Sequence, residues 1–90
     1  MATTNPVVTM LYFAWVREAI GRGEEQVALP PDVDTAAALI DWLAQRSAGH
    51  ATAFADRSRL RIAIDQVMVE PDAPIGGARE IAIFPPVTGG

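Results

Sequence analysis

The last six residues of this 90-residue chain carry its most specific chemical arrangement. Pro85 and Pro86 end strand pairing, because proline has no N–H to donate, and they stiffen the chain as it leaves the domain. Gly89 and Gly90 have no Cβ, so they can pass through a constriction that other side chains would block. Fully extended, this segment reaches roughly 20 Å, at about 3.3 Å per residue. We therefore expect residues 85–90 to be an extended tail that delivers the terminal carboxylate of Gly90 into another protein's pocket.

The other side chains offer little to an active site. The chain has no cysteine, which excludes disulfides, thiol nucleophiles and thiolate metal sites. His50 is the only histidine, and its Ala-, Gly- and Ser-rich surroundings are typical of an ordinary loop residue. The glycine pairs at 76–77 and 89–90 lack the spacing and the following helix of phosphate-binding loops. We expect no metal, no stably bound cofactor and no catalytic side chain.

The charge of the chain indicates which classes of partner it can bind. The net charge is −4, and all seven positive residues are arginines. An acidic chain without a row of basic residues binds nucleic acid poorly. It suits a protein partner with a basic pocket. No run of about 18 apolar residues is present, and residues 1–6 lack the features of a secretory signal. We expect a cytoplasmic protein without nucleic-acid or membrane partners.

Five strands are expected to position the tail. Runs of β-branched, aromatic or alternating apolar residues predict them. Pro30-Pro31 closes the second strand, and Asp65-Gln66 forms the turn between the third and the fourth. The last strand stops at Pro85. The predicted strands are residues 7–13, 25–29, 60–65, 67–69 and 80–84.

One main helix is expected, over about residues 36–47, with a cap at Asp34-Thr35. A short helical turn over 14–20 should end at Gly21, and residues 48–58 read as a mobile polar loop. The apolar positions of the main helix follow helical spacing and should face a sheet, with Trp42 at their margin. The order predicts an α+β fold: a single β-grasp (ubiquitin-like) domain over 1–90, with the main helix packed on one face of a mixed sheet.

Four segments resemble the MoaD family, the small subunits of molybdopterin synthase. The ending Phe84-Pro85-Pro86-Val87-Thr88-Gly89-Gly90 looks like that family's C-terminal signature. Leu11–Glu18 resembles its first strand and following turn, and residues 80–84 fit its last strand. Asp65-Gln66 stands where the family usually has Asn-Gln, and residues 77–79 replace an acidic, glycine-containing turn. The likeness covers nearly the whole chain, and the departures leave the tail unchanged.

The resemblance implies a sulfur carrier for molybdenum cofactor biosynthesis. In that family an activating enzyme uses ATP to convert the terminal carboxylate, here that of Gly90, into an acyl-adenylate. Sulfur from a donor enzyme then displaces AMP and leaves a thiocarboxylate. The loaded tail, here Pro85, Pro86, Val87, Thr88 and Gly89, inserts into the large catalytic subunit, where the sulfur is transferred to cyclic pyranopterin monophosphate. The chain would thus be the non-catalytic small subunit of a sulfurtransferase, in a heterotetramer of two small and two large subunits.

The family also docks through an apolar patch near the end of its last strand. The matching positions here are Phe13, Met68 and Phe84, and Arg17 is a candidate polar contact by the same resemblance. Some of these apolar side chains could instead belong to the core.

Three other functions remain open from the sequence. The same fold and activation chemistry serve sulfur carriers for thiamine, cysteine or tRNA thiolation. A protein modifier conjugated through Gly90 to lysines of its targets would also end in Gly-Gly. A plain interaction domain would need neither Gly89 nor Gly90, whereas both carrier chemistry and conjugation require them.

Overall fold

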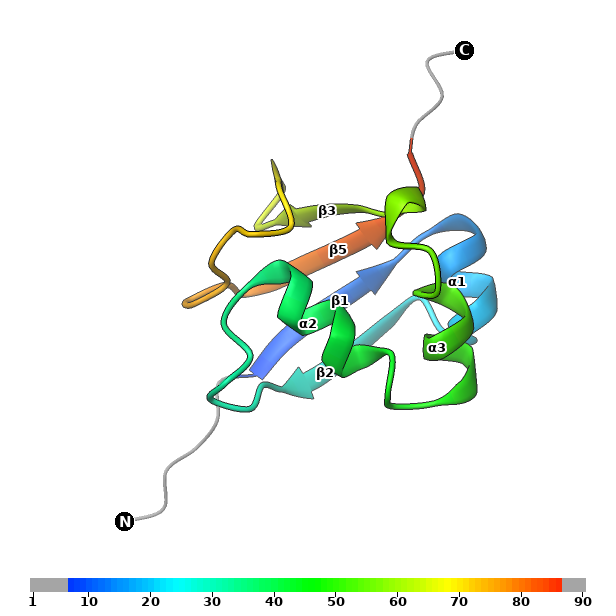
Figure 1. Cartoon of the computed structure of the whole chain (residues 1–90), viewed down its shortest axis with the longest axis horizontal. Coiled ribbons are helices and arrows are strands. Elements are labelled where there is room, and N and C mark those ends of the chain that lie inside the picture. Colours follow the sequence, from blue (N-terminus) through cyan, green and yellow to red (C-terminus); the bar gives the residue numbers. More distant parts are fainter. Residues whose placement is uncertain (1–6, 87–90) are drawn as a thin grey trace.

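Strand pairing brings both halves of the chain into one mixed sheet (Figure 1). The computed structural model describes residues 7–86. The sheet order is β2-β1-β5-β3-β4, in which β1 and β5 run parallel and the other neighbours run antiparallel. This is the mixed β-grasp sheet that the sequence predicts. The strands are β1 (Val7–Tyr12), β2 (Glu24–Ala28), β3 (Arg61–Ile64), β4 (Val67–Val69) and β5 (Glu80–Phe84).

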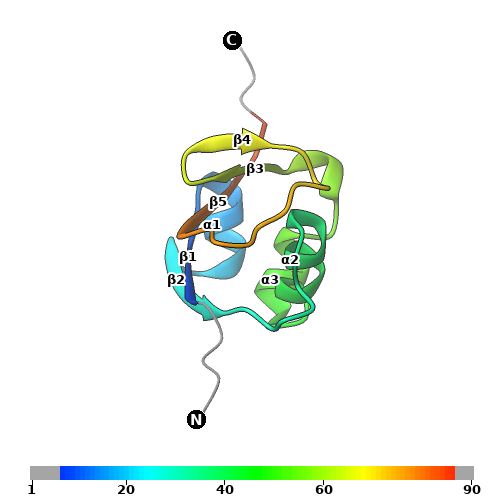
Figure 2. The ribbon, with the colours of Figure 1, turned by 90° about the vertical axis from the view of Figure 1, so that its left-hand side faces the viewer.

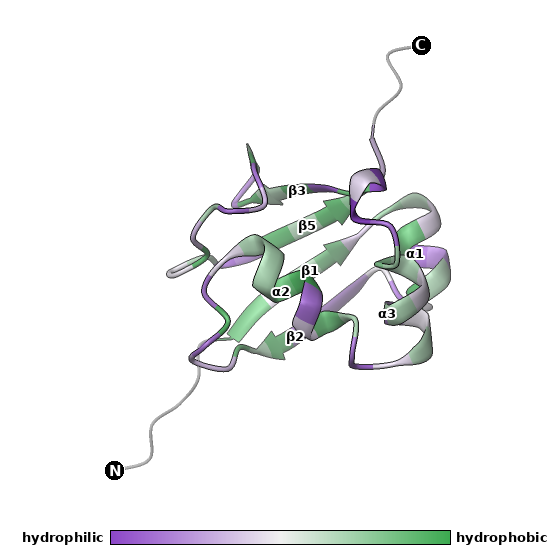
Figure 3. Cartoon of the chain, viewed as in Figure 1, coloured by the Kyte–Doolittle hydropathy of each residue, from purple (hydrophilic) through white to green (hydrophobic). Residues whose placement is uncertain are grey.

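Helices cover one face of this sheet. Figure 2 shows α2 and α3 on one side of the strands, with the opposite side free of helices. The covered face carries alternate strand residues, because successive side chains point to opposite faces, and β1 and β5 are correspondingly hydrophobic (Figure 3). The helical segments are α1 (Ala14–Ile20), α2 (Ala36–Leu43), α3 (Ala48–Ala53) and the 3-10 turn η1 (Arg57–Arg59). The core side chains from the covered face include Val8, Met10, Tyr12, Val27, Ile62, Ile81 and Ile83.

The main helix is shorter than the sequence pattern predicts. Thr35 caps α2 as expected, since its hydroxyl oxygen accepts the N–H of Ala38 at 3.2 Å. The helix ends at Leu43, and a second helix begins after Ser47, whose hydroxyl oxygen accepts the N–H of His50. The prediction of a mobile loop over 48–58 is therefore wrong. This segment forms α3 and η1, and the side chain of Phe54 between them is fully buried.

Glycine sets how closely α1 and α3 approach. Gly21 ends α1 in the left-handed conformation, with φ +93°, as the sequence predicts. A Cβ at Gly49 in α3 would collide with the carbonyl oxygen of Ala19 in α1. The absence of a side chain at Gly49 therefore allows the two helices to pack backbone against backbone.

The turn between β3 and β4 explains one departure from the family pattern. Asp65 and Gln66 both have positive φ, +48° and +72°, as a two-residue hairpin requires. The Oδ1 atom of Asp65 accepts the backbone N–H groups of Arg79 and Glu80, at 3.1 and 2.9 Å. Asparagine carries the same Oδ1 acceptor and also tolerates positive φ, so either residue suits this position.

Within residues 7–86 no helix has both the length and the hydropathy that a bilayer crossing requires.

Candidate functional site

Two phenylalanines lie where the last strand leaves the sheet. Because β1 and β5 are parallel, with Tyr12 paired to Ile83, their C-terminal ends meet at the same edge. Phe13 directly follows β1, and its carbonyl oxygen accepts the N–H of Val16 at the start of α1. This bond fixes the backbone, while 49% of Phe13 remains exposed. Phe84, the last residue of β5, is half-buried.

These side chains border a shallow apolar depression. Ala14 has φ +54°, a conformation that is uncommon for a residue with a Cβ, at the point where the chain turns from β1 into α1. Pro85 and Pro86 extend the depression toward the tail, so the root of the tail is itself apolar. The lining residues are Phe13, Ala14, Ala82, Phe84, Pro85 and Pro86.

A row of apolar residues continues from the depression across the helix-free face. Ala82 in β5 is the register partner of Leu11 in β1 and of Ala63 in β3. Ala63 is in turn paired with Met68 in the edge strand β4, and 58% of Met68 is exposed. The strand pairing thus places Met68 on the face that also carries Phe84. We call Leu11, Phe13, Ala63, Met68, Ala82 and Phe84 the open-face patch.

The structure brings most of the predicted interface residues together. Phe13 and Phe84 share the depression, and Met68 lies on the same face, two strands from β5. Arg17 is exposed on α1, with its side chain against Gly23, apart from the depression. Leu11 and Ala82 were not predicted, although their places in the alternating strand patterns of residues 7–13 and 80–84 were a usable signal.

The remaining tail residues lie outside the described part of the chain. Pro85 and Pro86 are the last described residues. The tail positions predicted beyond them are Val87, Thr88, Gly89 and Gly90.

A second cluster of polar side chains lies inside the domain. Tyr12 donates its hydroxyl proton to Oε2 of Glu25 at 2.7 Å, and Nε2 of His50 contacts the same oxygen at 2.6 Å. Since the ionised carboxylate only accepts, Nε2 must carry a proton. Nδ1 of His50 lies 2.7 Å from the hydroxyl oxygen of Ser47. Glu25 and His50 are only 8% and 6% exposed.

The prediction that His50 is an ordinary loop residue is therefore wrong. It belongs to α3 and joins that helix to β1 and β2 through Glu25. Ser47 followed three residues later by His50 was the local signal for a capped helix, but nothing in the sequence pairs His50 with Glu25.

Burial acts on both acidic groups of this cluster. Burial by itself would raise the pKa of Glu25, but the hydrogen bonds from His50 and Tyr12 and the nearby positive charge outweigh it, so the pKa is lowered. Burial, followed by the bond to Glu25, raises the pKa of Tyr12. Arg22 and Arg46 approach the other carboxylate oxygen at 3.9 Å. Every polar group of this cluster has a partner, so its evident role is to join elements of the fold. Across residues 7–86, no three His, Asp or Glu side chains are arranged to hold a metal ion.

The chain is similar to known proteins along nearly its whole length. The model of the ThiS family matches residues 10–90. The molybdopterin synthase sulfur carrier subunit of Escherichia coli (strain K12) is 39% identical over 84 residues, covering 93% of this chain and 100% of that protein. The protein of the same name from Haemophilus influenzae is 37% identical with the same coverage.

Solved structures share the fold. A putative molybdopterin converting factor, subunit 1, from Pyrococcus furiosus superposes with a TM-score of 0.69 at 26% identity, covering 90% of this chain and 98% of that one. The small archaeal modifier protein 1 of H. volcanii has a TM-score of 0.67 at 20% identity, covering 92% of this chain and all of its own. The second likeness shows the fold alone.

Proposed function

This chain belongs to the ThiS family, and on that basis we propose that it is the sulfur carrier subunit of a molybdopterin synthase. The observation that carries the proposal is its similarity to two proteins of that name, at 39% and 37% identity over their full lengths. The family match extends through Gly90, the residue that would carry the sulfur.

The proposed chemistry takes place at the carboxylate of Gly90. A carboxylate is a poor electrophile until its oxygen carries a good leaving group. An activating enzyme supplies that group: the carboxylate attacks the α-phosphorus of ATP, pyrophosphate leaves, and an acyl-adenylate forms. Hydrosulfide released by a donor enzyme then attacks the acyl carbon: the new C–S bond forms, the C–O bond to AMP breaks, and a thiocarboxylate remains on Gly90. The loaded sulfur is transferred to cyclic pyranopterin monophosphate in the active site of the large subunit.

The residues of this chain contribute binding and positioning to that reaction. The open-face patch offers the apolar area that an interface centre uses, and Pro85 and Pro86 end the strand pairing at the root of the tail. Arg17 is an exposed cation on α1 and would contact the partner at the margin. The groups that act on the substrate belong to the large subunit.

The alternatives receive less support. The similarity to a modifier protein at 20% identity supports a shared fold and does not favour conjugation to lysines. Carriers for other pathways would share the activation step, but the relatives from Escherichia coli and Haemophilus influenzae bear the molybdopterin synthase name.

Tail variants test the proposal. Deleting Gly90, or adding one residue after it, should abolish molybdopterin formation in a reconstituted synthase, because the reacting carbon is lost or displaced. The circular dichroism spectrum should remain that of the wild type, since residues 7–86 are unchanged. A tail-extended variant that still supports synthesis would overturn the proposal.

A further inference from the structure

Three arginines are concentrated in the five residues 57–61. The chain has seven arginines and a net charge of −4, so this is a local basic segment on an acidic protein. All three are exposed. They lie on η1 and at the start of β3, beside the strand that leads into the tail. The arginines are Arg57, Arg59 and Arg61.

Arg57 is used within the domain. One of its terminal nitrogens, Nη1, lies 2.5 Å from Oδ1 of Asp41 in α2, and its Nε donates to the carbonyl oxygen of Phe54 at 2.6 Å. These bonds tie η1 to α2. The charge of Arg57 is therefore matched by a neighbouring carboxylate.

Arg59 and Arg61 are held in place without a matching carboxylate. The guanidinium of Arg59 lies over the ring of Trp15, 4.9 Å from its centroid. Nη1 of Arg61 donates to the carbonyl oxygen of Leu60 at 2.9 Å and contacts that of Ser58 at 3.3 Å. Among the described residues, no carboxylate oxygen lies within 4.0 Å of either guanidinium.

The two nearby acids do not change this. Glu70 lines the same groove as Arg61, at more than ion-pair distance. Asp56 accepts both the N–H and the hydroxyl of Ser58 through its Oδ1 atom. These hydrogen bonds, and after them the charge of Arg59, lower the pKa of Asp56, but the Arg59 guanidinium stays beyond ion-pair distance from this carboxylate. Among the described residues neither guanidinium is in an ion pair, so both can bind an external anion.

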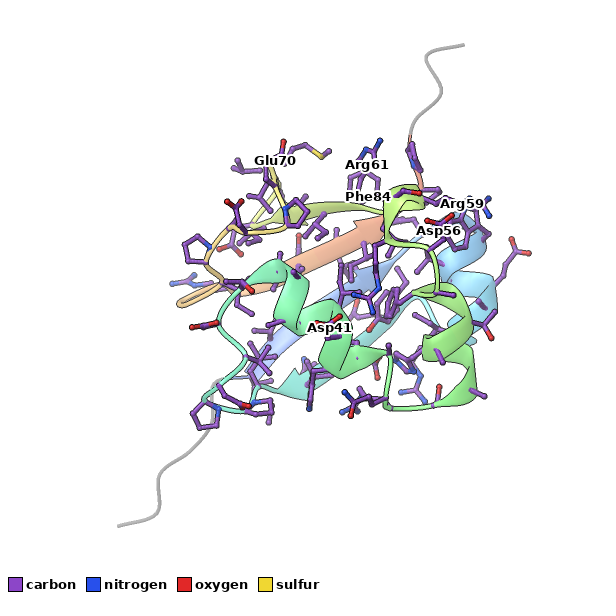
Figure 4. The ribbon with its side chains drawn as sticks, in the orientation of Figure 1. Asp41, Asp56, Arg59, Arg61, Glu70 and Phe84 are labelled. Atoms are coloured by element: carbon purple, nitrogen blue, oxygen red, sulfur yellow. The ribbon has the colours of Figure 1, made fainter. Side chains whose placement is uncertain are left out.

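Their position relates them to the open-face patch. Arg61 is the register partner of Phe84, so the two side chains lie next to each other on the helix-free face. Figure 4 shows Arg61 and Phe84 together at the end of β5, and Arg59 beside Asp56 at η1. The cations therefore border the apolar patch at the root of the tail, as charged rim residues border an interface centre.

We propose that Arg59 and Arg61 bind carboxylates of the large subunit, at the rim of the opening that admits the tail. This inference rests on the proposed function and names the chemistry of the partner surface at that site. A nucleotide phosphate is a poorer occupant, because an inserted tail would carry Gly90 up to about 20 Å from Phe84, at about 3.3 Å per residue. Charged rim groups mainly set the association rate and the orientation of docking. The acidic rim would thus align the carrier while the apolar patch provides most of the affinity.

Charge reversal tests the proposal, with the purified large subunit of the same organism as the probe. Arg61→Glu and Arg59→Glu should each slow association at low salt by roughly tenfold, and the difference from wild type should shrink at high salt, where charges are screened. Arg61→Lys should retain most of the rate. The matched control is Arg79→Glu, which makes the same charge change at the exposed residue preceding β5, at the opposite end of that strand.

Three patterns of association rates would overturn the proposal. Wild-type association rates for Arg61→Glu and Arg59→Glu would overturn it, as would an equal slowing by Arg79→Glu, which would reflect net charge alone. Slowed binding to the activating enzyme, with unchanged binding to the large subunit, would assign the cations to another partner and also overturn it. Loading of sulfur onto Gly90 is measured in parallel. If the variants load normally and bind the large subunit at the wild-type rate, only this inference fails. If the wild type neither loads nor binds, the proposed function fails.

Discussion

Phe84 joins the last strand, the apolar depression and the root of the tail in one residue. It is the register partner of Arg61 in β3 and is followed directly by the two prolines. Few interface residues carry most of a binding energy, and aromatic side chains at the centre are prominent among them.

We predict that Phe84→Ala weakens binding to the large subunit by roughly 2–4 kcal/mol, because an aromatic anchor at an interface centre is lost. Isothermal titration calorimetry measures the change. Val7→Ala is the matched control, since Val7 is 55% exposed at the start of β1, away from the depression, and its truncation should leave the affinity unchanged. Wild-type affinity in Phe84→Ala would remove Phe84 from the interface.

Asp65 shows how one side-chain atom fixes a turn. Asp65→Ala should lower the free energy of unfolding by about 1–2 kcal/mol, because the N–H groups of Arg79 and Glu80 lose their acceptor and alanine disfavours positive φ. Asp65→Asn should stay close to wild type, since it keeps the Oδ1 atom. Urea unfolding compares the three proteins. Equal losses in the alanine and asparagine variants would show that the negative charge, rather than the acceptor geometry, is what matters.

At the scale of elements, the Glu25 cluster links three segments that lie far apart in sequence. Tyr12 comes from β1, Glu25 from β2 and His50 from α3. Because the pKa values of Glu25 and Tyr12 are shifted in the folded protein, the free energy of unfolding should depend on pH at both acid and alkaline pH.

In a plot of the free energy of unfolding against pH, the fall at acid pH (the acid limb) is due to Glu25. Its folded pKa lies below its unfolded value near 4.3, so its contribution is complete above about pH 4.3 and is lost as the pH falls through the folded pKa. The alkaline limb belongs to Tyr12, whose folded pKa lies above its unfolded value near 10. That contribution is complete below about pH 10 and is lost as the pH rises toward the folded pKa.

Urea unfolding over a pH series measures both limbs. The chain has no lysine or cysteine and only one tyrosine, so Tyr12 is the only side chain whose pKa in the unfolded chain lies near 10. Glu25→Gln should flatten the acid limb, and Tyr12→Phe should flatten the alkaline limb. Limbs that keep the wild-type slopes in these variants would contradict the assignment.

The elements also show what the sequence could and could not predict. Strands β4 and β5 have the predicted bounds, because alternating apolar residues between prolines and turn residues leave few alternatives. Segment 48–58 was missed because alanine, glycine and threonine carry no clear periodicity, and its burial depends on Phe54 and on the close approach at Gly49. Pairing of His50 with Glu25 depends on tertiary packing, which no local pattern encodes.

For the candidate site, the sequence identified residues but not their arrangement. Phe13 and Phe84 could be selected by resemblance, yet only the parallel pairing of β1 and β5 shows that they share one depression. Met68 lies on the same face because β3 and β4 are paired in a fixed register, which a turn of two residues sets. Arg59 and Arg61 were not selected, since their significance lies in having no carboxylate partner among the described residues.

At the scale of the whole molecule, the described domain is a compact body from which β5 leads directly into the root of the tail. The sheet binds the start and the end of the described chain together, the helices cover one face, and the other face presents the open-face patch beside the root of the tail. A carrier of this kind needs a stable body and a reactive group that partners can reach in turn. The proposed activation by one enzyme and sulfur delivery to another both use this single end.

The most direct test of sulfur carriage is the intact mass of the chain after incubation with ATP, the activating enzyme and a sulfur donor. The account predicts a gain equal to one oxygen replaced by one sulfur, located on Gly90 by fragmentation. The gain should be absent when ATP is omitted, because the carboxylate must first be adenylated. An unchanged mass, with an activating enzyme shown to load another carrier of the family, would contradict the proposed function.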